Sequence, residues 1–441
     1  MNVMEPAETL RRAHSIRDAL PEGGLFHEKS WRIAPSAFPI DEPLAEEIEK
    51  LGYRLLLFVR ACNLLYRQSI KGRQPAWIAE WLDRGKPKEL VEWSRERAIQ
   101  NDLPRVLRPD LILTERGFVI AEVDNVPGGI GLTAWLNREY AALGDPVIGG
   151  ANGMLEGFGK ILPGGDILVS DEASTYRPEM EWLAKQLNGS ASDGKNWRVL
   201  TTDAGQKFQS NVYRFFELFD FANIACLPEL VSAMQAEEVS VTPPLKPYLE
   251  EKMWFALFWL RPLHEFWRRE LSERHFEALK QVIPYTWMLD PQPLPPVAVY
   301  PHLEINDWKE LTKFSQKERE LILKVSGFSE RAWGSRGVFV GSDLSSPQWR
   351  AAIEAGLTDW KKNPHILQRF QPGKLVDHFY LDEESGEVVP MKGRVRICPY
   401  YFIAEERTTC SGILATICPP DKKLLHGMGD AILAPVCASP E

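Results

Sequence analysis

Apolar residues recur every three to four positions between residues 41 and 70, a spacing that places them on one face of an α-helix. A similar pattern continues over residues 78–93, where the tryptophans fit packing between helices. We therefore predict that residues 1–105 form a mainly helical N-terminal region. The apolar face of the long helix consists of Leu44, Ile48, Leu51, Leu55, Phe58, Cys62 and Leu65.

The pattern changes to that of a β-hairpin over residues 108–124. Strand-like runs lie on either side of a turn at Gly117. Because side chains alternate along a strand, Glu122 and Asp124 share a face, and pairing places Asp110 beside them. Three clustered carboxylates repel one another unless a cation lies among them, and hard oxygen ligands suit Mg²⁺. The hairpin thus predicts a metal site at Asp110, Glu122 and Asp124, with solvated surface acids as the alternative.

Strands and helices alternate over residues 161–245, which predicts a small α/β lobe with a parallel sheet. No G-x-G-x-x-G sequence follows the first strand, so a dinucleotide-binding Rossmann domain is disfavoured. The expected strands are 166–170, 197–200, 212–216 and 222–225, and the expected helix is 178–187.

Two lysines stand out in the remainder of the chain, residues 246–441. Lys252 follows Glu251 at the start of a predicted helix, and Lys324 lies inside the apolar strand 321–325. Burying an unpaired ammonium is expensive, so Lys324 needs an anionic partner. A loop containing Gly334, Arg336 and Gly337 leads from this strand to a returning one, and its amides are suited to phosphate; an ordinary glycine-rich hairpin is the alternative.

Further elements are expected toward the C-terminus. Residues 349–360 predict a helix, and residues 365–370 predict a strand that carries Gln368. Residues 376–381 and 393–402 predict paired strands. Arg394 and Arg396 share a face of the second of these, where arginines can hold a phosphate or a carboxylate, although exposed strand arginines are the alternative.

Composition narrows the class of protein. The 441 residues exceed one ordinary core, so two or three lobes are expected, and a net charge of −9 argues against a nucleic-acid partner. The six cysteines form no C-x-x-C pair, which favours reduced thiols in a cytoplasmic protein. The chain shows neither a signal-peptide core nor an apolar run of membrane-spanning length. Its histidines lack metal-ligand spacing, and no G-x-S-x-G elbow occurs.

The hairpin residues resemble a known family. Arg108-x-Asp110, eleven residues, Glu122-x-Asp124 and a Pro/Gly turn resemble the pattern of the circularly permuted ATP-grasp enzymes, the group that includes glutathionylspermidine synthetase. Asp124 stands where that family usually has asparagine. The resemblance spans roughly residues 105–435 and extends to Glu251-Lys252, to the lysine strand with its glycine loop, and to Gln368.

The resemblance implies an α+β, circularly permuted ATP-grasp fold. Its parts would be an acid-bearing hairpin segment (106–160), a small pre-ATP-grasp-like α/β lobe (161–245) and a nucleotide-binding region (246–441), with the helical region 1–105 covering it. It also implies an ATP-dependent carboxylate–amine ligase that forms an amide through an acyl phosphate, acting on small-molecule carboxylate and amine substrates. A kinase-like phosphotransferase and a non-catalytic nucleotide-binding or interaction protein remain open alternatives.

Each site residue has an implied role. ATP would be contacted by the nucleotide set, Mg²⁺ by the three acids, and the carboxylate or acyl phosphate by two arginines. The nucleotide set is Lys252, Lys324, Gly334, Arg336, Gly337 and Gln368; the metal set is Asp110, Glu122 and Asp124; the arginines are Arg108 and Arg394.

Overall fold

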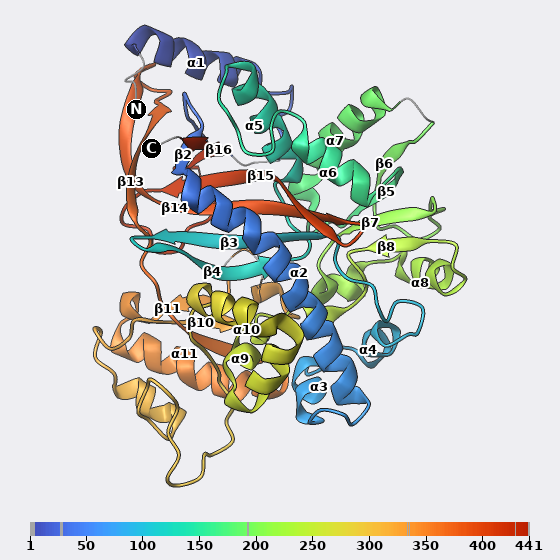
Figure 1. The fold of residues 1–441 in the computed structure, drawn as a ribbon, viewed down its shortest axis with the longest axis vertical. Helices are drawn as coiled ribbons and strands as arrows, with labels where there is room; N and C mark the ends of the chain where they lie inside the picture. Colours follow the sequence, from blue (N-terminus) through green and yellow to red (C-terminus); the bar gives the residue numbers. More distant parts are fainter. Residues whose placement is uncertain are drawn as a thin grey trace. The chain divides into compact units, whose positions relative to one another are not determined.

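The computed structural model describes residues 5–26, 30–191, 194–332, 334, 336–427 and 429–439 (Figure 1). The chain divides into two compact units, and each unit is assembled from segments that are distant in sequence. Unit 1 comprises Met1–Leu56, Asp102–Pro244 and Pro372–Glu441, and unit 2 comprises Leu57–Asn101 and Leu245–Gln371. The finer division into four contiguous segments stays a prediction. The mixture of helices and several sheets agrees with the α+β class.

A large mixed sheet forms the centre of unit 1. Its strands are β1 (Arg32–Ile33), β2 (Phe38–Asp41), β3 (Val106–Thr114), β4 (Gly117–Asp124), β13 (Leu375–Leu381), β14 (Val388–Ala404), β15 (Arg407–Cys418) and β16 (Ile432–Ser439). The order is β1-β16-β15-β14-β3-β4, with β13 paired to β14 and β2 paired to β16. The predicted hairpin β3–β4 is confirmed, and it joins strands from the C-terminal part of the chain. Circular permutation as such stays a prediction.

Residues 1–105 are mainly helical as predicted, but two features of this sheet differ from the sequence patterns. The short strands β1 and β2 lie in the region predicted as mainly helical, and both pair with β16 in parallel. Strand β13 pairs with residues 388–394 of β14, so most of the predicted partner, 393–402, pairs instead with β15 and β3. The reason is a tight turn between the strands, in which Ser385 bonds to Asp382 and Gly386 has a φ of +70°. That turn starts β14 five residues earlier than its apolar pattern indicates.

A parallel sheet confirms the predicted α/β character of residues 161–245. Its strands are β5 (Gly165–Val169), β6 (Trp197–Leu200), β7 (Asn211–Phe215) and β8 (Ser240–Thr242), in the order β6-β5-β7-β8. The predicted strand 222–225 is wrong, because most of it lies in the 3-10 helix η2 (Leu218–Asn223) and the coil that follows. There the amide of Asn223 donates to the carboxylate of Asp220 over 2.6 Å, a local bond that favours a turn over a strand.

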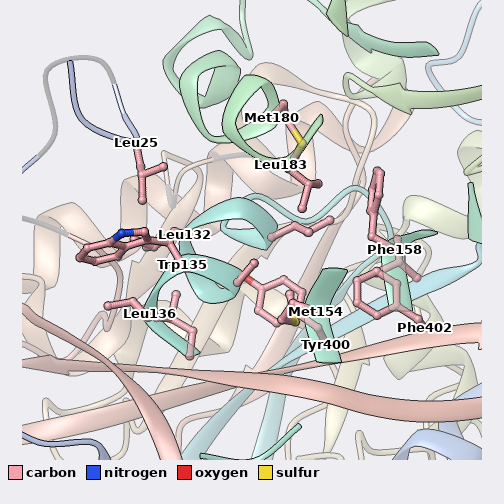
Figure 2. Close-up of a cluster of buried hydrophobic side chains, with 14 of the residues drawn as sticks. Leu25, Leu132, Trp135, Leu136, Met154, Phe158, Met180, Leu183, Tyr400 and Phe402 are labelled. Carbon is pink, nitrogen blue, oxygen red and sulfur yellow. The ribbon is translucent and has the colours of Figure 1, made fainter. Parts of the chain in front are cut away.

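Helices and both sheets of unit 1 share one apolar core (Figure 2). Trp135, Phe158, Leu183 and Tyr400 contribute to it from three different helices and from β14, and all four are buried. The ring of Phe158 meets Phe402 of β14 edge-on at 6.3 Å between centroids. The helices of this unit are α1 (Pro6–Asp18), α5 (Ile130–Ala142), α6 (Gly153–Ile161), α7 (Arg177–Ser190) and α8 (Leu227–Gln235).

Unit 2 is built on an antiparallel sheet with the order β11-β10-β12-β9. Its strands are β9 (Thr286–Met288), β10 (Leu321–Val325), β11 (Val338–Val340) and β12 (His365–Arg369). The predicted lysine-strand hairpin is therefore confirmed as β10–β11. A core that includes Trp287, Trp308, Trp349, Leu323 and Leu367 covers the sheet on the side of α11 (Ser346–Thr358).

The remaining helices are as expected in the N-terminal region and in the segment after residue 246. They are α2 (Glu42–Ile70), which begins in unit 1 and ends in unit 2, and α3 (Trp77–Leu82), α4 (Lys88–Ser94), α9 (Met253–Trp259) and α10 (His264–Val282). In the part of the chain that the structure describes, no helix combines the length and the apolar character that crossing a bilayer requires. Short 3-10 helices link these elements: η1 (Ser174–Tyr176), η3 (Pro247–Glu250), η4 (Arg261–Leu263), η5 (Trp308–Lys313), η6 (Glu330–Ala332), η7 (Gly341–Asp343) and η8 (Asp359–Lys361).

The packing of α6 against β14 predicts opposite effects for two glycines of that helix. A Cβ at Gly157 would lie 2.3 Å from the ring of Phe402, whereas a Cβ at Gly159 would make an ordinary contact at 3.5 Å with Leu187. Gly157→Ala should destabilise the protein by about 2 kcal/mol through overpacking. Gly159→Ala should stabilise it by roughly 0.5–1 kcal/mol through helix propensity. Thermal unfolding midpoints measure both, and equal shifts would contradict the packing described here.

Candidate functional site

The hairpin β3–β4 places its charged residues as the sequence predicts. Arg108 is opposite Asp124, and Asp110 is opposite Glu122. The register shifts just after Asp110, where the pairing continues from Leu111. Such an irregularity bends a strand and re-aims its side chains. The predicted juxtaposition of Asp110, Glu122 and Asp124 along the hairpin is therefore confirmed at the level of strand pairing.

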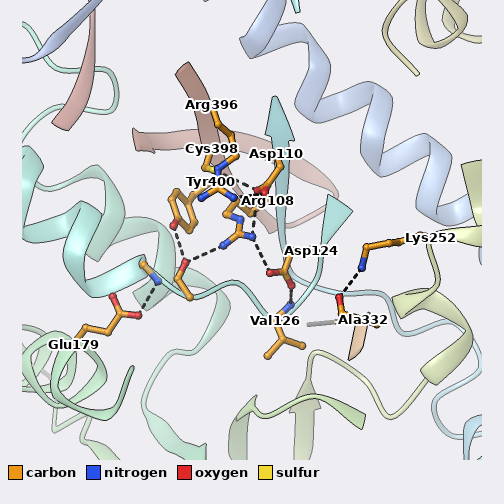
Figure 3. A network of polar contacts seen from close by, with 12 residues as sticks. Arg108, Asp110, Asp124, Val126, Glu179, Lys252, Ala332, Arg396, Cys398 and Tyr400 are labelled. Carbon is orange, nitrogen blue, oxygen red and sulfur yellow. Dashed lines mark hydrogen bonds and ion pairs between the residues drawn. The ribbon is translucent and has the colours of Figure 1, made fainter. Parts of the chain in front are cut away.

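An arginine, Arg108, lies between two of these acids, Asp110 and Asp124 (Figure 3). Nη2 of Arg108 lies 3.2 Å from Oδ1 of Asp110 and 3.0 Å from Oδ2 of Asp124. Its Nη1 donates to the carbonyl of Gly128 over 3.2 Å. Burial alone would lower the pKa of Arg108, but the two carboxylates raise it well above its ordinary value. Arg108 therefore stays charged and balances both acids.

A second arginine approaches Asp110 from the neighbouring strand. Nη1 of Arg396 donates to Oδ2 of Asp110 over 2.7 Å, and the Cys398 thiol donates to Oδ1 over 3.3 Å. Sequence reasoning placed Arg394 in the catalytic set, but in the structure Arg394 donates to the carbonyls of Gly373 and Pro420. Two-residue periodicity put both arginines on one face, and it could not tell which of them meets the acid.

The two aspartates differ in their electrostatics. Burial would raise the pKa of Asp110, but Arg396 and Arg108 outweigh burial and lower it below its ordinary value. For Asp124 burial prevails over the charge of Arg108, and its pKa is raised. Burial also raises the pKa of the Cys398 thiol to about 12, so Cys398 is a neutral donor to Asp110. Asp110 is thus the firmly ionised member of the pair.

The turn after the hairpin is held by groups that sequence reasoning missed. The hydroxyl of Tyr400 donates to the carbonyl of Gly128 over 2.7 Å. The fully buried carboxylate of Glu179 accepts from the amides of Gly129 and Leu132 over 2.7 and 2.9 Å, at the start of α5. A carboxylate at a helix N-terminus satisfies amides that have no partner within the helix. The polar groups of this turn therefore define where β4 ends and α5 begins.

The predicted metal site can be tested against these contacts. Both oxygens of Asp110 accept from arginine or thiol donors, and those of Asp124 accept from Arg108 and from the amide of Val126, 2.8 Å away. Within the residues described here, no group of three or more His, Cys, Asp or Glu side chains is arranged to hold a metal ion. As arranged, Asp110 and Asp124 do not fit Mg²⁺, and the metal assignment of Asp110, Glu122 and Asp124 stays a prediction.

Unit 2 brings together two residues of the predicted nucleotide set. Lys324 is buried in β10, and its ammonium donates to Oε1 of Gln368 in β12 over 3.0 Å. The amide of Gln368 donates in turn to the hydroxyl of Thr286 over 3.1 Å. The predicted anionic partner of Lys324 is thus replaced, in this contact, by an amide oxygen. The pairing joins positions 44 residues apart.

The remaining residues of the nucleotide set lie around the loop between β10 and β11. Nζ of Lys252 donates to the carbonyl of Ala332 in that loop over 3.1 Å. Gly334 has a φ of +60°, a left-handed conformation that favours glycine, and a Cβ at Gly337 would lie 2.6 Å from the carbonyl of Arg331, which leaves no room for a side chain there. Arg336 is exposed. Trp333 and Ser335 lie outside the described residues.

A buried ion pair beside Lys252 was missed by sequence reasoning. The carboxylate of Glu251 accepts from the ammonium of Lys86 and from the hydroxyl of Ser326, which follows β10 directly. The side chains of Lys86 and Glu251 are 1% and 2% exposed. The sequence singles out Glu251 only because it precedes Lys252. No local pattern connects Glu251 with Lys86, which is 165 residues away.

Comparison with known proteins bears on the fold. No protein-family model matches the chain, and no curated protein sequence matches it significantly. Among solved structures, a glutathione synthetase-like effector from Globodera pallida, in its apo form, matches with a TM-score of 0.57 at 12% identity, over 99% of this chain and 98% of that chain. The chain shares the effector's fold. A candidate gamma-glutamylcysteine synthetase from Methylobacillus flagellatus KT gives a TM-score of 0.40 at 14% identity, over 80% and 84% of the two chains.

The charge distribution around Asp110 predicts a pH-dependent effect of its removal. Asp110→Asn leaves two largely buried arginines without their shared carboxylate, and we expect a loss of about 3 kcal/mol near pH 7. Because the folded-state pKa of Asp110 is lowered, its contribution is present above its unfolded value, about 3.9, and is lost as pH falls through the folded pKa. The difference between variant and wild type should therefore shrink below about pH 4.

Asp124→Asn is the matched control for this experiment. The pKa of Asp124 is raised, so its ionisation opposes folding at neutral pH, and its replacement should cost much less. Unfolding midpoints at neutral and acidic pH measure both variants. Equal losses for the two, or a loss at Asp110 that is independent of pH, would contradict the assignment of Asp110 as the ionised partner of both arginines.

Proposed function

We propose that this protein is an ATP-dependent carboxylate–amine ligase of the ATP-grasp type. The contact between Lys324 and Gln368 carries the proposal, because it joins two residues that the family resemblance assigns to the nucleotide. The full-length likeness to the effector fold supports the same architecture. Within unit 2, Lys252 and Lys324 would offset phosphate charge, and the glycine-containing loop would supply backbone amides.

The arginines of unit 1 are the proposed carboxylate-holding groups. Arg108 and Arg396 both pair with Asp110, which fixes their positions. The negative charge of Asp110 also offsets the repulsion between the two guanidinium groups. Among the described residues, the Nε atoms of both arginines are buried without a hydrogen-bond partner. Guanidinium groups held in this way suit a carboxylate or an acyl phosphate. The contacts of Arg396 favour it over Arg394, whose catalytic role stays a prediction from sequence.

The proposed reaction has two steps. A carboxylate oxygen of the acid substrate attacks the γ-phosphorus of ATP, which forms an acyl phosphate and releases ADP. The nitrogen of the amine substrate then attacks the acyl carbon, loses a proton and displaces inorganic phosphate, which forms the amide. No protein nucleophile takes part, so the chain's own groups serve to position substrates and to balance charge.

The family resemblance implies that Mg²⁺ accompanies ATP, held by Asp110, Glu122 and Asp124. A bound Mg²⁺ supplies charge compensation for phosphoryl oxygens. Because the oxygens of Asp110 and Asp124 are engaged by arginine and amide donors, no step above depends on a metal at these residues.

An ADP-release screen tests the proposed function. Purified protein is incubated with ATP and Mg²⁺ and with a panel of carboxylic acids, each with and without amines, and products are identified by mass spectrometry. ADP release that requires both an acid and an amine, with an amide product, is the expected result. A phosphorylated product without an amine would instead identify a kinase-like enzyme. ATP binding without turnover across the panel would favour a non-catalytic nucleotide-binding protein.

The assignment of Lys324 predicts a loss of nucleotide affinity. Lys324→Ala removes the buried ammonium that bonds to Gln368, and ATP affinity should fall at least tenfold, or about 1.4 kcal/mol. Lys317→Ala is the control, because Lys317 is exposed and lies seven positions earlier in the chain. Calorimetric titration with ATP measures both variants. Unchanged affinity in Lys324→Ala would remove Lys324 from the nucleotide set.

The metal expectation is tested at Glu122. Glu122→Gln keeps the side chain's size and removes its charge, so the protein should stay folded, since carboxylate repulsion in the hairpin is relieved. If Glu122 is a ligand, Mg²⁺-dependent ATP turnover should fall roughly a hundredfold or more. Asp124→Asn should be milder, because it restores the residue that the resembled family usually carries. Normal turnover by Glu122→Gln alongside an inactive Asp124→Asn would refute the metal assignment.

A further inference from the structure

The buried pair of Lys86 and Glu251 ties a segment of the helical N-terminal region to the rest of unit 2. Lys86 lies between α3 and α4, where Gly85 has a φ of +74° and a Cβ would lie 1.9 Å from the carbonyl of Lys362. Trp81 of α3 meets Trp360 edge-on at 5.3 Å between ring centroids. This packing aims the Lys86 ammonium inward, toward Glu251.

The network continues from Glu251 to the backbone of Lys252 and to the residue that follows β10. Glu251 holds the hydroxyl of Ser326, whose Oγ accepts from the amide of Met253 over 2.8 Å. The carbonyl of Ser326 accepts from the amide of Lys252 over 2.7 Å. Since Ser326 directly follows β10, which carries Lys324, the position of the Lys252 backbone is fixed relative to that strand.

The same carboxylate also borders the start of the glycine-containing loop. A Cβ at Gly327 would lie 2.5 Å from Cδ of Glu251, so a side chain there would displace a carboxylate that is held on both sides. The Lys86 ammonium lies 5.7 Å from the centre of the Phe328 ring, the next residue of the loop. Lys86 is therefore within reach of both the Lys252 segment and the loop's first residues.

We propose that Lys86 is a positioning residue for nucleotide binding, and that it acts through Glu251 and Ser326 on Lys252 and on the entry to the loop. The inference rests on the proposed function, because it takes Lys252 as a phosphate-binding residue. It gives residues 57–101 a role beyond covering the unit. Without Lys86, the carboxylate of Glu251 would be buried and unpaired next to Lys252, and it would compete with phosphate for the Lys252 ammonium. The positive charge of Lys86 therefore leaves that ammonium available to bind phosphate.

The test compares lysine-to-methionine changes at two neighbouring positions. Lys86→Met removes the buried charge and keeps a side chain of similar length. The Kd for ATP in Mg²⁺-containing buffer should rise at least tenfold. Lys88→Met is the control, because the Lys88 side chain is 89% exposed and forms a surface ion pair with Glu92. Hydrogen exchange at the amides of Lys252 and Met253 should accelerate in Lys86→Met and stay unchanged in Lys88→Met.

Coupling to Lys252 separates positioning from general stability. In a Lys252→Ala background, adding Lys86→Met should have little further effect on ATP affinity, because its route of action is gone. Combining Lys86→Met with Glu251→Gln should restore part of the affinity, since no unpaired carboxylate remains. Should Lys86→Met fail to fold, Ser326→Ala removes only a hydroxyl of the same network, and it should weaken ATP binding in the same direction.

The outcomes are distinct. If wild-type protein binds ATP and Lys86→Met binds it equally well, the inference is overturned and the proposed function stands. A loss that is just as large in the Lys252→Ala background also overturns it, since it would indicate a general destabilisation. If wild-type protein binds no ATP, the proposed function fails, and the inference fails with it.

Discussion

The ion cluster around Asp110 is the constraint on which the organisation of unit 1 depends. Asp110 lies on β3, Arg396 on β14 and Asp124 on β4, so the arginine contacts tie three adjacent strands together. A buried carboxylate without its partners would cost several kcal/mol. Because a shift of one residue moves every side chain of a strand to the other face, only one register of the three strands pairs all of these charges.

The turn that follows the hairpin depends on the same cluster. The carbonyl of Gly128 accepts from both Arg108 and Tyr400, while Glu179 binds the amides of the next residues. The carbonyl and amide groups of one short turn are thus met by side chains from three different elements. Such a turn has little freedom, and it sets the direction in which α5 leaves the sheet. Positioning of the candidate site and formation of the core are therefore parts of one arrangement.

Local patterns in the sequence predicted much of the fold and part of the site. Hydrophobic spacing located α2 and the β3–β4 hairpin, and strand alternation placed Asp110 beside Glu122. Sequence patterns could not pair Arg396 with Asp110, because the two residues are 286 positions apart and only the pairing of β14 with β3 brings them together. The wrong strand at 222–225 has a local cause, since a polar side-chain bond there outweighs a short apolar pattern.

The division of each unit among distant segments explains where its buried charges lie. In unit 1, Arg396 and Asp110 join segments 372–441 and 102–244, and Arg12 joins segment 1–56 to Asp145 over 2.6 Å. In unit 2, Lys86 and Glu251 join segments 57–101 and 245–371. Apolar packing alone tolerates many arrangements, whereas a buried charge tolerates only the one that supplies its partner. Each of these pairs therefore limits which segments can associate within its unit. Local sequence therefore finds the acids and lysines of the candidate site, but it does not connect Asp110 with Arg396 or Glu251 with Lys86, because these partners come from distant segments.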